Sequence, residues 1–188
     1  VVDPSGATSG SIKVVRGGNF TEMGLRSALR HSTSVPGHLG NGLGFRLAFR
    51  QTSPPPPITD ANFTTAINLW FSDEANATAT YGHIKDWNVS GVTNMSNAFK
   101  DRTTFNEDIS GWDVSSVMNM AYMFKNASAF NQPIDYWNTS AVTNMGQLFH
   151  GSTAFNQDIG DWNMSAVTNM NNMFQNAAAF NQDIGDWN

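Results

Sequence analysis

The stretch FNQDIGDWNMSAVTNMNNMFQNA at residues 155–177 decides the fold, because its large residues recur every 25 residues along the chain. Each apolar position begins a column of similar residues, with one member per repeat. These columns are Phe105, Phe130, Phe155 and Phe180; Ile84, Ile109, Ile134, Ile159 and Ile184; Trp87, Trp112, Trp137, Trp162 and Trp187; Val92, Val117, Val142 and Val167; Met95, Met120, Met145 and Met170; and Phe99, Phe124, Phe149 and Phe174. A repeat this short cannot bury its own hydrophobic face, so stacked repeats should join the columns into one core.

The spacing of apolar residues changes within each repeat. The pattern Ile109-x-x-Trp112-x-Val114 suits a short strand, whereas the pattern of residues 120–124 suits a helical or 3₁₀ turn. The sequence therefore predicts an α+β solenoid over residues 81–188, in which each coil holds a short strand and a short helix. Two polar columns should be turn residues whose amides bond to the coil backbone: Asn94, Asn119, Asn144, Asn169, and Asn106, Asn131, Asn156, Asn181.

The repeat unit resembles the BspA-type leucine-rich repeat, a bacterial surface protein repeat, and this resemblance extends over about 58–188. The segment ITDANFTTAINLWF at residues 58–71 reads like the helix that caps the first repeat, with Thr59 or Asp60 at its start. The resemblance implies a leucine-rich-repeat-type solenoid in a secreted or surface-exposed protein used for adhesion or scaffolding. It implies no catalytic residues.

Residues 10–50 resemble the C-terminal end of the formylglycine-generating, sulfatase-modifying enzyme domain, whose fold is C-type-lectin-like. The motifs are VVRGGNF at 14–20, LRSALR at 25–30 and GLGFRLAFR at 42–50. Those enzymes use cysteines, and this chain has none, so their activity is not carried over. We expect a β-rich lectin-like remnant over 1–50, with strands at 12–15 and 45–49, a Pro-rich linker over 51–57, a capping helix over 58–80 and the solenoid over 81–188.

Charge divides the chain into a basic and an acidic part. Residues 1–50 carry six Lys and Arg against two acids (6 − 2 = +4), and the remainder carries four against thirteen (4 − 13 = −9), which together give −5. Opposite ends can attract one another head to tail, although two parts of different origin would give the same asymmetry. The acidic repeats argue against nucleic acid as a partner, and no apolar run reaches the roughly 20 residues of a membrane span.

Glycosylation is the clearest chemical signal in the sequence. Sequons of the form Asn-x-Ser/Thr occur at Asn19, Asn62, Asn76, Asn88, Asn94, Asn126, Asn138 and Asn163. The alternative is that Ser and Thr follow Asn in polar turns and that the repeat multiplies one coincidence. The run Ser53-Pro-Pro-Pro-Pro57 should form an extended, stiff spacer. It also resembles the repeat of plant and algal extensins, which makes Pro54, Pro55, Pro56 and Pro57 candidates for hydroxylation.

Catalytic and metal-binding patterns are missing from the sequence. The four histidines, at positions 31, 38, 83 and 150, show no ligand-pair spacing, and the absence of cysteine removes thiol chemistry. Stacked carboxylates in the columns Asp108, Asp158, Asp183 and Asp86, Asp161, Asp186 could hold Ca²⁺, but capping of turns is the more common role of such residues. We expect no enzyme activity, no metal and no cofactor.

The function that the sequence predicts is that of an extracellular or cell-surface structural glycoprotein. The chain stops at Trp187-Asn188 within a coil, which should leave one end of the solenoid without a polar cap. If that end meets the basic N-terminal part of the next copy, the contact does not close and generates a fibril or surface coat. The expected partners are thus other copies of the chain and covalent glycans. The alternative is an adhesion module of a larger adhesin that binds carbohydrate or protein.

Overall fold

The computed structural model describes residues 12–16, 19–23 and 54–187, and the chain divides into two units, Val1–Pro54 and Pro55–Asn188. In the first unit, β1 (Ile12–Arg16) and β2 (Asn19–Met23) form an antiparallel sheet in which Ile12 pairs with Met23. The strand expected at 45–49 and the other motifs of residues 24–50 lie outside the described residues.

The second unit begins with two helices, α1 (Phe63–Ser72) and α2 (Glu74–Tyr81). One face of α1 is apolar and buried, with Phe63, Ala66, Ile67 and Trp70 at the spacing of a helix that packs on one side. The expected capping segment over 58–80 holds two helices because the backbone of Asp73, with a φ of −157° and a ψ of 83°, interrupts the helical conformation. The Asp73 carboxylate accepts a hydrogen bond of 3.0 Å from the backbone N–H of Asn76 and so caps α2.

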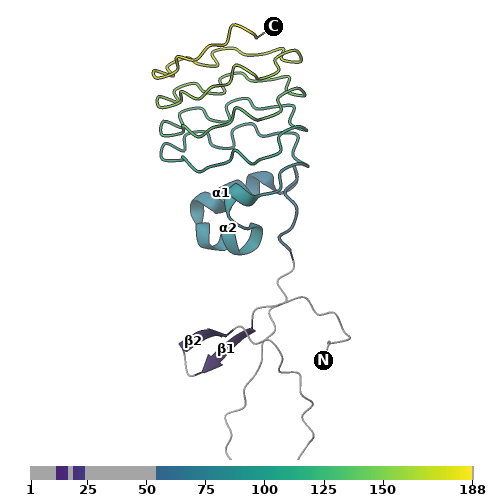
Figure 1. The fold of residues 1–188 in the computed structure, drawn as a ribbon, viewed down its shortest axis with the longest axis vertical. Helices are drawn as coiled ribbons and strands as arrows, with labels where there is room; N and C mark the ends of the chain where they lie inside the picture. The colour runs from purple at the N-terminus through teal and green to yellow at the C-terminus, as the bar shows by residue number, and fades with distance from the viewer. Residues whose placement is uncertain (1–11, 17–18, 24–53, 188) are drawn as a thin grey trace, which may run out of the picture. The chain divides into compact units, whose positions relative to one another are not determined.

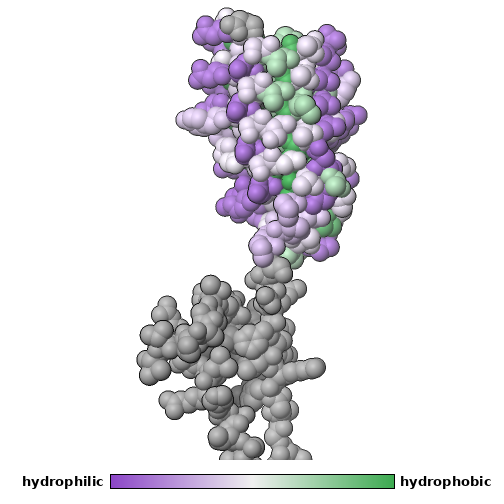
Figure 2. All heavy atoms as spheres, turned by 90° about the vertical axis from the view of Figure 1, so that its right-hand side faces the viewer, coloured by the Kyte–Doolittle hydropathy of each residue, from purple (hydrophilic) through white to green (hydrophobic). Residues whose placement is uncertain are grey.

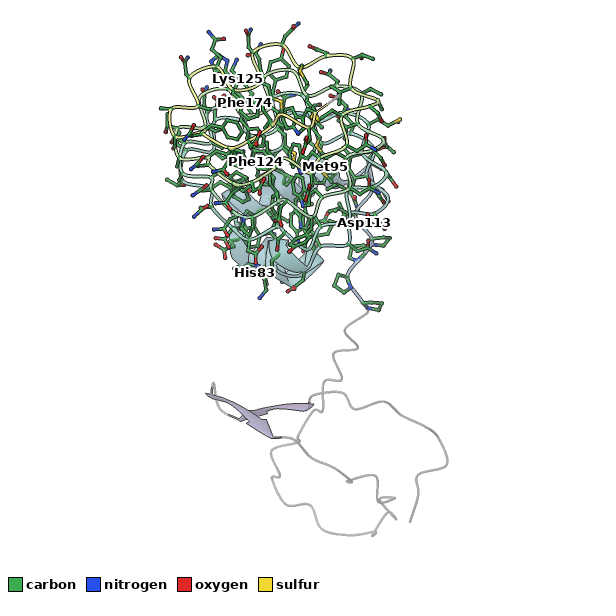
Figure 3. All side chains as sticks on the ribbon, turned by 45° about the horizontal axis from the view of Figure 1, so that its top comes forward. His83, Met95, Asp113, Phe124, Lys125 and Phe174 are labelled. Carbon is green, nitrogen blue, oxygen red and sulfur yellow. The ribbon has the colours of Figure 1, made fainter. Side chains whose placement is uncertain are left out.

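After the short 3₁₀ helix η1 (Ile84–Asp86), residues 87–187 wind into successive coils that lie one upon another, which we call the coil stack (Figure 1). Parallel bridges join Asn94 to Asn119, Asn119 to Asn144, and Asn144 to Asn169. The two Phe columns stack within and between coils: ring centroids lie 4.0 Å apart for Phe124 and Phe130 and 5.6 Å apart for Phe124 and Phe149. Figure 3 shows Phe124 inside the stack and Asp113 at its edge.

The expectation of a strand and a helix in every coil is wrong. Between residues 54 and 187 the structure contains α1, α2 and η1 but no strand, so no sheet of stacked strands exists there. At residues 120–124, where we expect a helix, the N–H of Met123 donates to the carbonyl of Met120 within the coil. The N–H groups of Met120 and Tyr122 instead donate to carbonyls of the next coil. Tyr122 also has a φ of 61°, which interrupts a right-handed helix.

The expected strand at 109–114 is missing for a different reason. The N–H of Trp112 closes a turn onto the carbonyl of Ile109 at 3.1 Å, and this segment makes no backbone bond to a neighbouring coil within the described residues. The connection runs through the side chain, since the indole Nε1 of Trp112 donates to the carbonyl of Ile84 at 2.9 Å. The corresponding indole of Trp137 donates to Ile109 in the same way. The spacing of apolar residues gives no sign that the indole N–H groups of the Trp column join adjacent coils.

Candidate interaction surface at the open end of the coil stack

Four continuous chains of hydrogen-bonded peptide groups run through the coil stack. In the first, the N–H of Met95 donates to the carbonyl of Asn119, whose peptide carries the N–H of Met120, and this N–H donates to Asn144. The other three chains follow the same rule. Their N–H groups recur every 25 residues. One chain contains Asn97, Tyr122 and Gln147, the next Phe99, Phe124 and Phe149, and the last Asp101, Asn126 and Gly151.

All of these peptide groups point the same way along the stack. Aligned and hydrogen-bonded peptide dipoles add, as they do along an α-helix, and each bond polarises the next. The N–H end of each chain therefore carries a partial positive charge, like the first turn of a helix. The N–H ends of these four chains lie at the last described coil, because each N–H in them donates to the coil that follows it. The N–H groups of Met118, Thr143 and Thr168 run the other way and donate to the preceding coil.

The helical end of the stack is closed by Asp60. In later coils, the carbonyl of the preceding coil accepts from two successive N–H groups, as that of Thr93 does from Met118 and Asn119. For the first coil, the carboxylate of Asp60 takes this place and accepts from the N–H groups of Thr93 at 2.8 Å and Asn94 at 3.1 Å. The side chain of Asp60 thus replaces the carbonyl of a coil that is not there.

Apolar contacts complete this closed end. Phe63 of α1 packs edge-on against Trp112, with 6.1 Å between ring centroids, and Phe71 packs against Phe99 at 6.2 Å. The guanidinium of Arg102 lies 4.2 Å from the centre of the Phe71 ring. The helices therefore cover the first coil with aromatic surface, while Asp60, which precedes α1, supplies the hydrogen-bond acceptors.

The opposite end is open in both respects. The N–H groups that end the four peptide chains have no acceptor among the described residues; they are those of Met170, Asn172, Phe174 and Asn176. Met95, Met120 and Met145 are completely buried, whereas Met170 of the same column is 45% exposed. The last members of the other apolar columns are only partly buried, namely Val167, Phe174, Phe180, Ile184 and Trp187. We call this surface of residues 167–187 the open end.

The side of the coil stack offers less apolar surface. Figure 2 shows a narrow hydrophobic stripe along the stack with hydrophilic residues on both sides of it. In the described part of the chain, four large hydrophobic side chains are strongly exposed: Met118, Tyr122, Tyr136 and Met170. Tyr136 is 89% exposed and belongs to none of the core columns.

The predicted glycosylation sites differ in burial and in whether the side-chain Nδ2 group donates a hydrogen bond. Asn76, Asn88, Asn94, Asn138 and Asn163 are exposed. Asn62 and Asn126 are half-buried, and their Nδ2 groups donate to the Pro57 carbonyl at 3.0 Å and to Asp101 at 2.7 Å, respectively. Asn19 lies in β2, of which only the backbone is described. The Nδ2 groups at 62 and 126 are therefore engaged in hydrogen bonds, whereas at Asn88, Asn94, Asn138 and Asn163 the Oδ1 atom accepts from the backbone N–H two residues further on.

The proline segment also lies on the surface. Pro54, Pro55, Pro56 and Pro57 are all exposed and belong to no helix or strand. They precede Ile58, whose N–H bonds to Asn88 of the first coil, and Pro55, Pro56 and Pro57 border a shallow recess beside Tyr81 and Asp86. The segment thus flanks the closed end of the second unit.

The carboxylates of the stack mostly cap turns. Asp108, Asp158 and Asp183 each accept a hydrogen bond from the backbone N–H two residues further on. Side-chain and backbone hydrogen bonds from Ser110 lower the pKa of Asp108, and those from Ser115 lower the pKa of Asp113. Hydrogen bonds to a carboxylate favour its charged form, so each of these turns is tightest when its carboxylate is ionised.

Groups that could hold a metal ion and helices that could span a membrane are both missing from the described residues. Asp158, Asp161, Asp183 and Asp186 border one recess, but nowhere in the described ranges do three His, Asp or Glu side chains gather in a way that could hold a metal ion. Within residues 54–187 and the two strands, no helix has the length and apolarity needed to cross a membrane.

Comparison with known proteins assigns the chain to a protein family. A family model described as "Mycoplasma protein of unknown function, DUF285" matches residues 65–187. No curated protein and no solved structure matches the chain. The expected membership of the BspA-type repeat family is therefore corrected to this family. The match includes none of residues 10–50, so the resemblance to the sulfatase-modifying enzyme domain is also unsupported and is withdrawn.

Proposed function

Since the chain belongs to the family described as Mycoplasma protein of unknown function, DUF285, which brings no activity with it, we propose a function from the geometry: a structural protein outside the cell that self-associates head to tail into a fibril or coat. It performs no catalysis. The observation that carries this proposal is the division of charge along the chain, with a net +4 over the first fifty residues (6 − 2) and −9 over the remainder (4 − 13).

The two ends of the second unit differ, which favours a directional assembly. α1, α2 and Asp60 cover one end, so a second coil stack cannot continue the ladder there. The favoured contact joins the open end of one copy to a different surface of the next, and such heterologous contacts propagate into filaments.

Charge supports the same direction of assembly. Residues 51–188 have a net charge of −9 and the first fifty residues have +4 (4 − 13 and 6 − 2), so the first part of one copy and the second part of another attract over the range of the Debye length. The location outside the cell and the glycan coat rest on the sequons, of which five have exposed side chains.

The test is the concentration dependence of mass for the 188-residue chain, measured by sedimentation velocity and checked by negative-stain electron microscopy. We expect filaments, and we expect Met170→Lys to abolish them, since it places a cation beside four N–H groups. The matched control is Met118→Lys, because Met118 is 50% exposed, close to the 45% of Met170, but lies on the side of the stack. Monomers at all concentrations, or an equal effect of both variants, would refute the proposal.

A binding module remains a second candidate because of one observation. Tyr136 projects from the side of the stack with 89% of its surface exposed, as a residue that contacts a ligand would. In that case the chain would serve as the adhesion module of a larger adhesin. Binding of the chain to a glycan array that is lost in Tyr136→Ala, with no change in self-association, would favour this candidate.

A further inference from the structure

We propose that the coil stack binds acidic polysaccharides along one edge, which we call the cationic edge. It is formed by Lys100, Tyr122, Lys125, Gln147 and His150. The expected ligands are polymers of pyranose rings that carry carboxylate or sulfate groups. This site goes beyond the proposed self-association. All five residues belong to coils that another described coil follows.

The basic groups of this edge come from one column of the repeat. Lys100, Lys125 and His150 occupy the same position in three successive coils. The N–H of Asp101 donates to the carbonyl of Lys125 at 2.8 Å, and the N–H of Asn126 donates in the same way one coil later, at 2.7 Å. Adjacent coils are roughly 5 Å apart, so the column presents one basic side chain per coil. A polymer whose charges repeat along its length can meet several of them at once.

The carboxylates of the stack gather at other positions of the repeat. Acidic residues lie from Glu107 to Asp113 and at the equivalent positions of the later coils. Within residues 87–187 the exception is Asp101, whose carboxylate accepts from Asn126 at 2.7 Å. Figure 3 shows Lys125 and Asp113 apart from one another on the stack. Since salt screens charges beyond about 8 Å, an anion at the cationic edge meets cations first, although residues 51–188 carry a net −9 (4 − 13).

The groups that hold Lys125 in place are neutral. Its Nζ donates to Oε1 of Gln147 at 2.7 Å and lies 5.5 Å from the centre of the Tyr122 ring. Both contacts orient the ammonium group without neutralising its charge. His150 is held less firmly, because its buried Nδ1 has no hydrogen-bond partner among the described residues. The edge thus positions its basic groups and leaves them able to bind a ligand.

Tyr122 places an aromatic ring where the fold favours an amide. The same column holds Asn97, Gln147 and Asn172, and all four residues have a positive φ, which is 61° for Tyr122. Asn tolerates this left-handed backbone, whereas a bulky side chain is strained by it. The Tyr122 side chain is 37% exposed, so burial offsets the strain only in part. Strain kept at an exposed residue indicates a function of its side chain.

These features together fit an acidic sugar polymer. The C–H face of a pyranose ring packs on an aromatic ring such as that of Tyr122, and sugar hydroxyls bond to an amide such as that of Gln147. A carboxylate or sulfate group pairs with a lysine ammonium. Single-stranded nucleic acid also carries anions, but its bases stack on several aromatic side chains in succession. Tyr122 is the only aromatic residue of its column in the described coils, which favours the sugar polymer.

The first experiment measures binding of the 188-residue chain to polygalacturonate and to heparin by isothermal titration calorimetry, with neutral dextran as the control polymer. The tighter of the two acidic polymers distinguishes carboxylate from sulfate as the preferred anion. Tyr122→Asn should weaken this binding at least tenfold. Because Asn suits the left-handed backbone, its melting temperature should be equal or higher, which separates lost binding from unfolding. Tyr136→Ala removes an exposed ring outside this column and should leave binding unchanged.

The second experiment tests the charge. Lys125→Gln should weaken binding at least tenfold and reduce its dependence on salt concentration. Its matched control is Lys85→Gln, since Lys85 is an exposed lysine at another position of the repeat. In the ¹⁵N-labelled chain, an oligosaccharide of the tighter-binding polymer should shift the amide signals of Tyr122, Lys125 and Gln147. Shifts confined to the basic first fifty residues would overturn the inference.

The remaining outcomes are equally decisive. Equal losses in Lys85→Gln and Lys125→Gln would reject the site, because they indicate attraction to charge in general. Dextran binding as tight as that of the acidic polymers, or tighter binding of poly(dT), would reject it too. Binding lost in Tyr122→Asn with unchanged sedimentation supports the site independently of the fibril. Binding lost only in Tyr136→Ala would reject the cationic edge and support the second candidate function.

Discussion

The carboxylate of Asp60 binds Thr93 twice: Oδ1 accepts from its backbone N–H at 2.8 Å and Oδ2 from its hydroxyl at 2.6 Å. The two residues are 33 positions apart, and this bidentate contact joins the segment before α1 to the first coil. It starts the ladder that the later coils continue with backbone carbonyls as acceptors, to which the hydroxyls of Thr143 and Thr168 also donate.

Asp60→Ala should therefore destabilise the second unit. It leaves the N–H groups of Thr93 and Asn94 without their acceptor, and we expect a loss of about 1–2 kcal/mol in the free energy of unfolding, the range for a lost capping side chain. Urea denaturation measures it. Asp113→Ala is the control, because that carboxylate binds only Ser115 of its own turn and should cost less. Equal losses would show that Asp60 is an ordinary turn cap.

Stability should fall in acid. The hydroxyl of Thr93 is the largest cause of a lowered pKa at Asp60, and hydrogen bonds from Ser110 and Ser115 lower the pKa values of Asp108 and Asp113. A carboxyl whose pKa is lower in the folded state stabilises the fold above its unfolded pKa, and this is lost as the pH falls through about 4 and below. The melting temperature should decline from pH 6 to pH 3, with a shallower decline in Asp60→Ala. A flat profile in the parent chain would contradict this.

Gly151→Ala should destabilise the coil stack. Gly151 has a φ of +70°, and a Cβ there would lie 2.4 Å from Oδ1 of Asn126. The Nδ2 group of the same Asn126 side chain donates to Asp101. Strain and the displaced amide together should cost about 1–2 kcal/mol. Gly111→Ala is the matched control, since no atom lies within 4 Å of its added Cβ. That variant should be neutral or more stable by up to about 1 kcal/mol, and a larger loss at 111 than at 151 would reject this account.

Glycans at Asn138 and Asn163 should exclude one another. The hydroxyl of Thr139, next to Asn138, donates to the carbonyl of Asn163 at 3.0 Å, so the two sequons lie on adjacent coils. Backbones of adjacent strands or coils are roughly 5 Å apart, too close for two attached glycans. In material secreted from a eukaryotic host, glycopeptide mass spectrometry should find either site occupied but few molecules with both. Frequent double occupancy would contradict this spacing.

The sequence predicted the core better than it predicted the backbone. The 25-residue columns identified the buried residues, because burial follows from side-chain type, and the Asn columns do bond to backbone, as Asn106 accepts from the N–H of Asn131. The secondary structure was wrong. Tyr122 and Gln147 occupy left-handed positions that sequence patterns reserve for Gly or Asn, and so nothing marked the interruption of the helix.

The candidate site was only partly predictable. The stacking of the coils could be expected from the repeats, but the direction of the peptide chains could not, because it depends on which N–H groups face the next coil. The role of Asp60 was also missed. Its position before a helix suggested an ordinary N-cap, whereas its partners lie 33 and 34 residues away.

The four chains of peptide groups that begin at residues 95, 97, 99 and 101 also imply an order in which the coils open. The amides of Met145 and Phe149 are held by the last coil, whereas those of Met170 and Phe174 are held by no described residue. Local opening should thus begin at the last coil and travel backward toward α1, so that hydrogen–deuterium exchange slows coil by coil. A copy bound at the open end would delay the first step of that sequence, and assembly would then protect each molecule from unravelling.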